Sequence, residues 1–311
     1  VLSAPNGQQI DRALDGLDFM VSLDFYINET TQHADIILPP TSALEHDHYD
    51  IAFHRLAVHN TARFNEPVFE PAPGTLHDWE IFNGLGQAIA AHKGIEVKSL
   101  PSPDKMVDMG IQRGPYGAAA GHELELTLDK IKQHPHGLDI GPLAPSLPER
   151  LCTSDGKITL VADYISKDLK RLGADTAMTE ADELLLIGRR HIRSNNSWLH
   201  NSHRLVKGKP RWQLLMHPED LATRNLEDQS QVRIESRVGS VETQVVASDD
   251  VMRGVVSLPH GWGHKRAGVS MTIAAAQKGV SCNDLTDDKL IDEISGNAAL
   301  NGVPVRIYGV Q

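Results

Sequence analysis

The sequence lacks the features that mark nucleic-acid-binding, membrane-spanning or disulfide-stabilised proteins. Lys and Arg number 30 against 41 Asp and Glu, a formal net charge of −11, which argues against neutralising a phosphate backbone. No apolar run approaches the ~20 residues of a membrane span. The two cysteines, Cys152 and Cys282, form no CxxC motif and no disulfide framework, which fits a reducing compartment. We therefore expect a cytoplasmic protein.

The sequence also lacks common catalytic signatures and a usual beginning. It contains no GxSxG, HExxH, GxxxxGK[ST] or GxGxxG motif, so we assign no catalytic residue from motifs. Its start has neither the basic nor the apolar region of a signal peptide, and it has no initiator Met. We expect a fragment of a longer polypeptide.

The first part of the chain predicts an α/β layer. Residues 19–23 and 36–38 are short apolar runs that we expect to pair as parallel strands. Residues 76–94 predict a helix, with Asp78 in or just before its first turn and Gly94 as its stop.

The middle of the chain is rich in proline and glycine and predicts few strands. Residues 123–133 predict a helix within it. Residues 153–173 predict a turn, a short strand and an amphipathic helix.

After Thr179 the pattern changes to short strands separated by turn residues. Residues 232–235 alternate cleanly, "SRVGS" indicates a hairpin, and "HPEDLATRN" predicts one short helix between strands. Several short strands at this spacing favour a closed barrel. The segments expected to contain them are 182–190, 212–220, 230–250, 254–263 and 302–310.

Residues 44–60 hold four histidines and three acidic residues, a composition that suggests a metal site. No pair has the helical i, i+4 spacing of a zincin, and no second cluster supplies a clear fourth ligand. A polar loop is therefore the favoured interpretation, and a zinc- or nickel-binding protein is the alternative. The histidines are His46, His48, His54 and His59.

Two long stretches resemble the molybdopterin oxidoreductase family, which includes dimethyl sulfoxide reductase, formate dehydrogenases and nitrate reductases. "DFYINETTQHADIILPPTSALEHD" is similar to a strand, "TET"-like turn and "ADVVLP" segment of that family. "LLLIGRRHIRSNNSWLHN", residues 217–263, "GVSCNDLTD" and "SGNAALNGVPVRI" are similar to its dinucleotide-binding barrel. Only Arg55 matches the family well within residues 46–58, which leaves the substrate open.

The resemblance implies a partial Rossmann-like α/β layer followed by a double-psi-type β-barrel, the molybdopterin dinucleotide-binding domain. Residues 1–94 would be the C-terminal part of the α/β domain, 95–180 an irregular connection and 181–311 the barrel. The chain would be the C-terminal portion of an enzyme that binds molybdenum or tungsten through two molybdopterin guanine dinucleotides. A metal ligand and any iron–sulfur cluster would lie in other parts, so we expect no activity from the fragment alone.

The residue types of the barrel loops suit such a cofactor, because a pyrophosphate and amide-like ring edges need cations, hydroxyls and amides. A purely structural role remains open for each loop. Residues 188–201 could form a solvated Asn/Ser turn, residues 260–264 a barrel turn with a packed Trp, and residues 283–290 an Asx turn with a helix cap. The resemblance favours cofactor contact. The residues that we expect to contact the cofactor are Asn28, Thr30, Arg55, Gly188, Arg189, Arg190, His191, Ser194, Asn195, Asn196, Ser197, Trp198, His260, Trp262, Gly263, Asn283 and Thr286. We expect no protein side chain of this segment to bind the metal.

The expected partners are a small-molecule substrate, a redox partner and the rest of the same polypeptide. The substrate chemistry would resemble that of formate dehydrogenases or of oxyanion or thiosulfate reductases. Two other functions remain open: a non-catalytic binding protein that keeps the barrel, and the His-rich metal-binding protein.

Overall fold

The computed structural model describes residues 1–174 and 182–310, which divide into two compact units. The first unit comprises Val1–Ser22, Tyr26–Ile37 and Thr159–Gln311. The second comprises Leu23–Phe25 and Leu38–Ile158. The three-part domain division predicted from the sequence stays a prediction.

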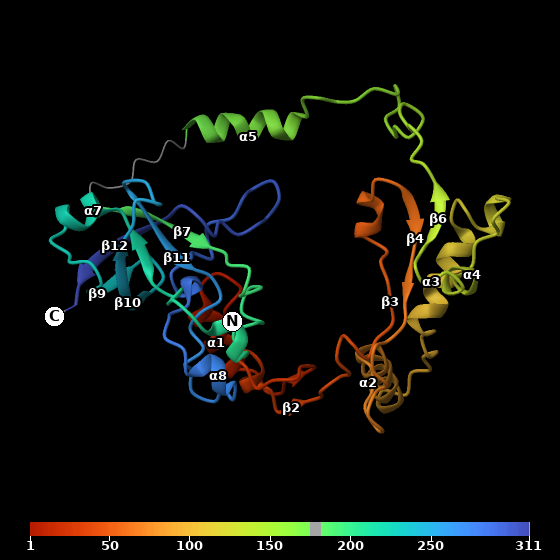
Figure 1. The fold of residues 1–311 in the computed structure, drawn as a ribbon, viewed down its shortest axis with the longest axis horizontal. Helices are drawn as coiled ribbons and strands as arrows, with labels where there is room; N and C mark the ends of the chain where they lie inside the picture. The colour runs from red at the N-terminus through yellow and green to blue at the C-terminus, as the bar shows by residue number, and fades with distance from the viewer. Residues whose placement is uncertain (175–181, 311) are drawn as a thin grey trace. The chain divides into compact units, whose positions relative to one another are not determined.

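The first unit is built on a closed barrel of six strands (Figure 1). Its strand order is β10-β8-β11-β7-β12-β9, and β9 and β10 close it as an antiparallel hairpin. Two neighbouring pairs, β10 with β8 and β11 with β7, are parallel. The strands are β7 (Leu184–Arg189), β8 (Leu214–Met216), β9 (Gln231–Glu235), β10 (Ser240–Ala247), β11 (Val255–Pro259) and β12 (Val303–Gly309).

Apolar and polar residues alternate along the barrel strands, so the apolar side chains fill the interior of the barrel. On β9, Val232 and Ile234 are fully buried while Arg233 between them is exposed, as the period of two of a strand requires. β7 contributes Leu184 and Leu186 to the same interior. The predicted barrel, its hairpin and its short helix are confirmed.

The N-terminal segment contributes a parallel strand pair and a helix to the first unit. β1 (Val21–Ser22) and β2 (Ile36–Ile37) pair in parallel, as predicted. The helices of this unit are α1 (Gly7–Asp15), η1 (Thr31–His33), α5 (Asp163–Ala174), α6 (His203–Val206), α7 (Pro218–Thr223), α8 (Thr272–Ala275) and η4 (Cys282–Asp284).

The second unit has a small core of its own, formed by Ala62, Phe64, Leu126, Leu128 and Ile131. Two antiparallel strand pairs, β3 with β5 and β4 with β6, run through it. Its elements are β3 (His48–Tyr49), η2 (Phe53–Leu56), β4 (Asn60–Ala62), β5 (Phe64–Asn65), α2 (Asp78–His92), α3 (Pro103–Arg113), η3 (Ala118–Ala120), α4 (Leu128–Lys132) and β6 (Leu138–Gly141).

Two helices predicted from the first and middle parts of the chain can be compared with the structure. The helix predicted at 76–94 is confirmed as α2, with Asp78 in its first turn. The helix predicted at 123–133 is shorter, because Thr127 caps its beginning by accepting a hydrogen bond from the backbone N–H of Lys130.

The short strand predicted before α5 was wrong. In the described chain, residues 157–161 form no strand, and Leu160 is 87% exposed. A strand needs a neighbour to satisfy its backbone groups, and this apolar run pairs with none of the described strands.

None of the helices in residues 1–174 and 182–310 is both long and apolar enough to cross a membrane.

The barrel core predicts the cost of one substitution. Leu186 is fully buried, so Leu186→Ala should lower the free energy of unfolding by about 2–5 kcal/mol. Leu160→Ala removes the same atoms from an exposed site and should cost less than about 0.5 kcal/mol. Urea unfolding of both variants measures the difference, and equal costs would contradict the assigned core.

Candidate functional site

The candidate site lies where two parallel strands of the barrel end. β7 and β11 pair in parallel, with Gly188 opposite Leu258 and Arg189 opposite Pro259. Their carboxyl ends therefore meet at one edge, and the loops that follow them, residues 190–202 and 260–264, lie together. A cavity of about 580 Å³ opens there, which we call the loop cavity. It is lined by Arg190, His191, Ile192, Ser194, Asn195, Asn196, Leu199 and His260.

Close backbone contact fixes the two loops against each other. Asn195 and Asn196 adopt left-handed backbone angles, φ 41° and 62°, which asparagine tolerates better than most residues. Gly261 has φ 85°, and a Cβ there would lie 2.0 Å from the carbonyl oxygen of Asn196. Glycine is thus required at position 261 for both its backbone angle and the contact.

The loop cavity is cationic, with histidines held towards their neutral form. Arg190 donates a hydrogen bond to Oδ1 of Asn196. Partial desolvation and the positive charges of nearby arginines lower the pKa of His191. Burial, and then the positive charge of Arg190, lowers the pKa of His260. The cavity therefore combines a permanent cation with neutral hydrogen-bonding groups, a set that suits an anionic, polar ligand.

Behind the loop cavity lies a row of four buried polar side chains, which we call the histidine network: Ser194, His200, His264 and Glu29. Ser194 Oγ lies 2.9 Å from His200 Nε2, and His200 Nδ1 lies 2.9 Å from His264 Nε2. His264 Nδ1 lies 2.7 Å from Glu29 Oε1. All four side chains are at most 5% exposed, so the network is shielded from bulk water.

Aromatic packing holds the network in place and disfavours charge on His200. The indole of Trp262 stacks on the His200 ring with centroids 4.1 Å apart. Burial, with a contribution from His264, lowers the pKa of His200 to about 4. His200 is therefore a neutral imidazole at neutral pH.

Two predicted residues of β7 face the barrel itself. The guanidinium of Arg189 donates hydrogen bonds to the carbonyl oxygens of Ser257, at 2.9 Å, and Gln213, at 2.8 Å. The backbone N–H of Gly188 donates to Oδ1 of Asn301 at 2.8 Å. Both residues tie the end of β7 to its neighbours, and their contact with a cofactor stays a prediction.

The other predicted residues near the network have varied surroundings. Ser197 is half-buried, Trp198 is 80% exposed, and Trp262 is packed against His200. A Cβ at Gly263, where φ is 105°, would lie 2.6 Å from the backbone nitrogen of Ser281. Gly263 thus permits close approach of two protein segments.

The predicted residues of the N-terminal segment, and those at and just after η4, stabilise turns. Oδ1 of Asn28 accepts hydrogen bonds from the backbone N–H groups of Thr30, at 2.9 Å, and Thr31, at 3.1 Å. Thr286 Oγ1 donates to Oδ1 of Asn283 at 3.0 Å, and both residues are fully or almost fully buried. These contacts match the open Asx-turn interpretation, and direct cofactor contact by these residues stays a prediction.

Arg55 lies in the second unit, on η2, where it lines a different cavity of about 550 Å³ with mostly apolar walls. The histidines of residues 44–60 also lie in this unit, and His46, His54 and His59 engage separate partners. Among the described residues, no group of three or more His, Cys, Asp or Glu side chains is placed to hold a metal ion. The partners are Thr41 for His46, Thr61 for His54 and Asp139 for His59.

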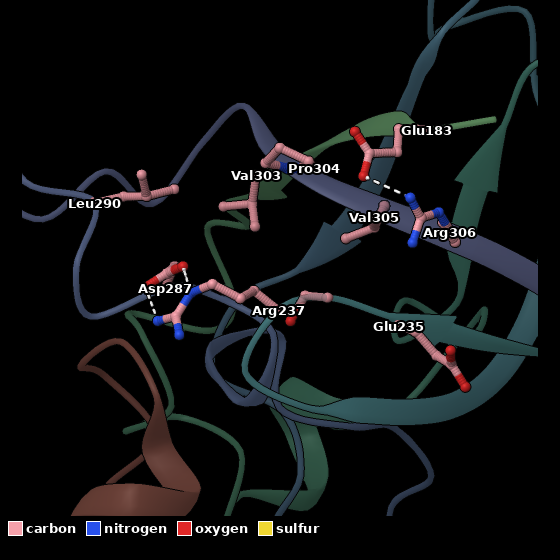
Figure 2. A pocket seen from close by; sticks show the side chains of 10 residues that line it. Glu183, Glu235, Arg237, Asp287, Leu290, Val303, Pro304, Val305 and Arg306 are labelled. Carbon is pink, nitrogen blue, oxygen red and sulfur yellow. Dashed lines mark hydrogen bonds and ion pairs between the residues drawn. The ribbon is translucent and has the colours of Figure 1, made fainter. Parts of the chain in front are cut away.

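Figure 2 shows another cavity of the first unit, about 500 Å³ in volume, beside β9 and β12. Its arginines face carboxylates: Arg306 Nη2 lies 3.3 Å from Glu183 Oε1, and Arg237 is held by Asp287. Because these positive charges are matched, the cavity is less suited to an anion than the loop cavity.

Glu29, His200, His264 and Gly261 belong to this site but are not among the residues predicted from the sequence. Glu29, His200 and Gly261 lie within the segments that resemble the family and His264 directly follows one, but His200 and His264 are 64 positions apart and Glu29 and His264 are 235 apart. Only a histidine directly after "SWL" and another after "GWG" could have drawn attention to them.

Two segments of the chain match known protein families. The family described as "Molybdopterin oxidoreductase" matches residues 1–88, and the "Molydopterin dinucleotide binding domain" matches residues 184–304. The resemblance inferred from the sequence is confirmed. The loop cavity and three members of the histidine network lie within the second match.

Among curated proteins, the chain is 24% identical to the probable oxidoreductase YoaE of Bacillus subtilis (strain 168), covering 96% of the chain and 41% of that protein. It is 24% identical to the assimilatory nitrate reductase catalytic subunit of the same organism, covering 84% and 36%. It is 24% identical to the dimethyl sulfoxide/trimethylamine N-oxide reductase of Rhodobacter capsulatus, covering 80% and 33%. The chain thus spans about two fifths or less of each relative.

Among solved structures, acetylene hydratase from Pelobacter acetylenicus matches with a TM-score of 0.69 and 18% identity, covering 99% of this chain and 42% of that one. This likeness concerns the fold. With the closed barrel and the dinucleotide-binding match, it confirms the predicted fold class, a partial α/β layer followed by a double-psi-type barrel.

Gly261→Ala should destabilise the site more than an equivalent change elsewhere. The added Cβ meets the Asn196 carbonyl, so we expect a loss of about 3 kcal/mol in the free energy of unfolding. Gly254 has a similar φ of 78° with open space around it, so Gly254→Ala should cost only about 1 kcal/mol. Chemical denaturation compares them, and equal losses would refute the close loop contact.

The low pKa of His200 predicts a pH dependence of stability. The unfolded residue binds a proton near its ordinary pKa of 6.5, whereas the folded one does so only near 4. Stability from this group is complete above pH 6.5 and is lost as pH falls towards 4, by about 3 kcal/mol.

His200→Gln should therefore flatten the curve of unfolding free energy against pH between 7 and 4. Ser194→Ala removes a neighbour without a titrating group, so it should shift the curve while keeping most of its slope. A His200→Gln curve parallel to that of the wild type would show that the buried histidine does not titrate as assigned.

Proposed function

We propose that this chain, which belongs to the molybdopterin oxidoreductase family, is the dinucleotide-binding portion of a molybdenum or tungsten enzyme. The observation that carries the proposal is the loop cavity. It lies at the joint carboxyl ends of two parallel strands, and it combines a cation, neutral imidazoles and small polar side chains.

The donors of this cavity fit the dinucleotide part of molybdopterin guanine dinucleotide. Arg190 supplies a permanent positive charge for a pyrophosphate, and Asn195 and Asn196 supply amides for ring edges. A volume of about 580 Å³ lies within the ~300–1,000 Å³ of small-molecule sites. The backbone contact at Gly261 fixes the donors before any ligand arrives, which lowers the entropic cost of binding.

The remaining predicted contacts belong to the same proposal. Ser194, His191 and His260 line the cavity, and Ser197 and Trp198 follow in its loop. We propose that the whole enzyme holds two such dinucleotides, with the barrel contributing loops to both. When bound, this cofactor supplies a metal centre that exchanges electrons with a substrate.

The reaction that we propose for the whole protein is electron-transfer oxidation or reduction of a small substrate. Formate-like substrates and oxyanion- or thiosulfate-like substrates are the two classes we favour. The isolated chain is expected to be inactive, with the metal ligand, any iron–sulfur cluster and the contact with a redox partner elsewhere in the protein. A cytoplasmic location fits the two unpaired cysteines, Cys152 and Cys282.

Elemental analysis of the intact natural protein that contains this chain tests the proposed function. We expect molybdenum or tungsten together with about two guanine nucleotides released per metal on denaturation. Zinc or nickel without guanine nucleotide would favour the His-rich alternative. Neither metal nor nucleotide would overturn the enzyme assignment.

A matched pair of variants then tests the loop cavity. Arg190→Ala removes a charge-assisted hydrogen bond worth about 1.5–3 kcal/mol, so guanine-nucleotide affinity should fall about 10- to 100-fold. Arg253→Ala removes an exposed arginine that pairs with Glu219, and it should leave nucleotide retention unchanged. Equal retention in both variants would show that the nucleotide binds elsewhere.

A further inference from the structure

The histidine network connects the loop cavity to a carboxylate through side chains alone. Ser194 lines the cavity and also contacts His200, so it belongs to both. The other end, Glu29, comes from the N-terminal segment just before η1. Successive separations of 2.9, 2.9 and 2.7 Å are hydrogen-bond distances throughout.

The donor and acceptor roles along this row follow from the chemistry of its ends. An ionised Glu29 carboxylate can only accept, so Nδ1 of His264 carries a proton and donates to it. If His264 is neutral, its Nε2 accepts from Nδ1–H of His200. Nε2 of neutral His200 then accepts from the hydroxyl of Ser194. In this state Ser194 Oγ presents only lone pairs to the cavity.

One added proton reverses the two hydrogen bonds between Ser194, His200 and His264, while Nδ1–H of His264 still donates to Glu29. If His264 becomes an imidazolium beside the Glu29 carboxylate, its Nε2–H donates to Nδ1 of His200. His200 remains neutral but changes tautomer, and its Nε2–H donates to Ser194 Oγ. The hydroxyl hydrogen of Ser194 is then free to point into the cavity as a donor.

We propose that Ser194, His200, His264 and Glu29 form a proton relay that takes one proton from a ligand in the loop cavity and stores it on His264. The ligand class is a group with an exchangeable N–H or O–H. The relay rests on the proposed function only for the identity of that ligand.

Each proton transfer along the relay forms one bond to hydrogen and breaks another. A proton from the ligand bonds to Ser194 Oγ, and the serine's own hydrogen moves to Nε2 of His200. The Nδ1 hydrogen of His200 moves to Nε2 of His264. Ser194 and His200 end neutral, His264 gains one positive charge, and the ligand loses one proton. The ion pair with Glu29 stabilises that charge.

The surroundings support storage on His264 and disfavour storage on His200. Trp262 covers the ring of His200, and burial holds that histidine neutral, whereas His264 has Glu29 at 2.7 Å. The charged groups that face the network are Arg211 on the His200 side and the amino group of Val1 on the Glu29 side. Around that amino group lie Arg266, Asp11 and Asp284, with Arg266 paired to both carboxylates.

Glu29→Gln separates a relay from a purely structural row. The amide oxygen of glutamine still accepts from His264, so the neutral row keeps its geometry, but the imidazolium loses its counter-ion. Loss of this counter-ion should disfavour the imidazolium form of His264. Glu242→Gln removes the same charge from the exposed face of β10, where Glu242 pairs with Arg233, and should shift neither histidine.

Nuclear magnetic resonance of the intact protein with ¹⁵N-labelled histidine reads both events as pH is varied. Assignment comes from His200→Gln and His264→Gln. We expect His200 to change tautomer at the pH where His264 gains its proton, and both events to move together in Glu29→Gln. A single His200 tautomer throughout, or an unchanged midpoint in Glu29→Gln, would overturn the relay.

The same preparations distinguish failure of the relay from failure of the proposed function. Guanine-nucleotide content reports on the cofactor, whereas the tautomer change is a property of the protein alone. Ser194→Ala tests proton exchange with the cavity. In this variant the pH midpoint of His264 protonation should still be measurable, but bound nucleotide should no longer shift it. If bound nucleotide shifts the His264 midpoint equally in wild type and Ser194→Ala, Ser194 is not the point of entry.

Discussion

The parallel pairing of β7 with β11 is the constraint on which the candidate site depends. Two parallel neighbours end at the same edge, so the loops after Arg189 and Pro259 have to share one region. An antiparallel pairing would send these loops to opposite ends of the barrel. Asn196 and Gly261 are thereby brought into contact although they are far apart in the sequence, and the absence of a side chain at Gly261 lets the backbones touch.

Polar groups buried behind this edge distinguish the site from an ordinary barrel end. Buried imidazoles are costly unless they are hydrogen-bonded, and here each ring nitrogen of His200 and His264 has a partner. Satisfying these groups also joins the N-terminal segment to the barrel, because the row ends on Glu29. The same contacts that stabilise the first unit therefore connect the cavity to a carboxylate, and structure and proposed chemistry share one set of residues.

Much of the fold could be predicted from local pattern, because period and turn chemistry act over a few residues. The alternation at Val232 and Ile234 and the turn residues that follow were sufficient to predict that β9 and β10 form a hairpin. The run near Leu160 misled for the same reason: apolar residues alone do not supply a neighbouring strand. Long-range facts were beyond such patterns. Arg189 stands next to Arg190 in the sequence, but the local pattern does not show that its guanidinium donates hydrogen bonds to the carbonyl oxygens of Ser257 and Gln213. The pairing of His200 with His264 could not be read locally either.

We propose above that the loop cavity holds the dinucleotide of the cofactor. The most direct measurement is an experimental structure of the intact protein purified with its cofactor. We expect phosphate density within hydrogen-bond distance of the Arg190 guanidinium, with Asn195 or Asn196 contacting the nucleotide. A dinucleotide bound away from residues 190–196 would contradict it.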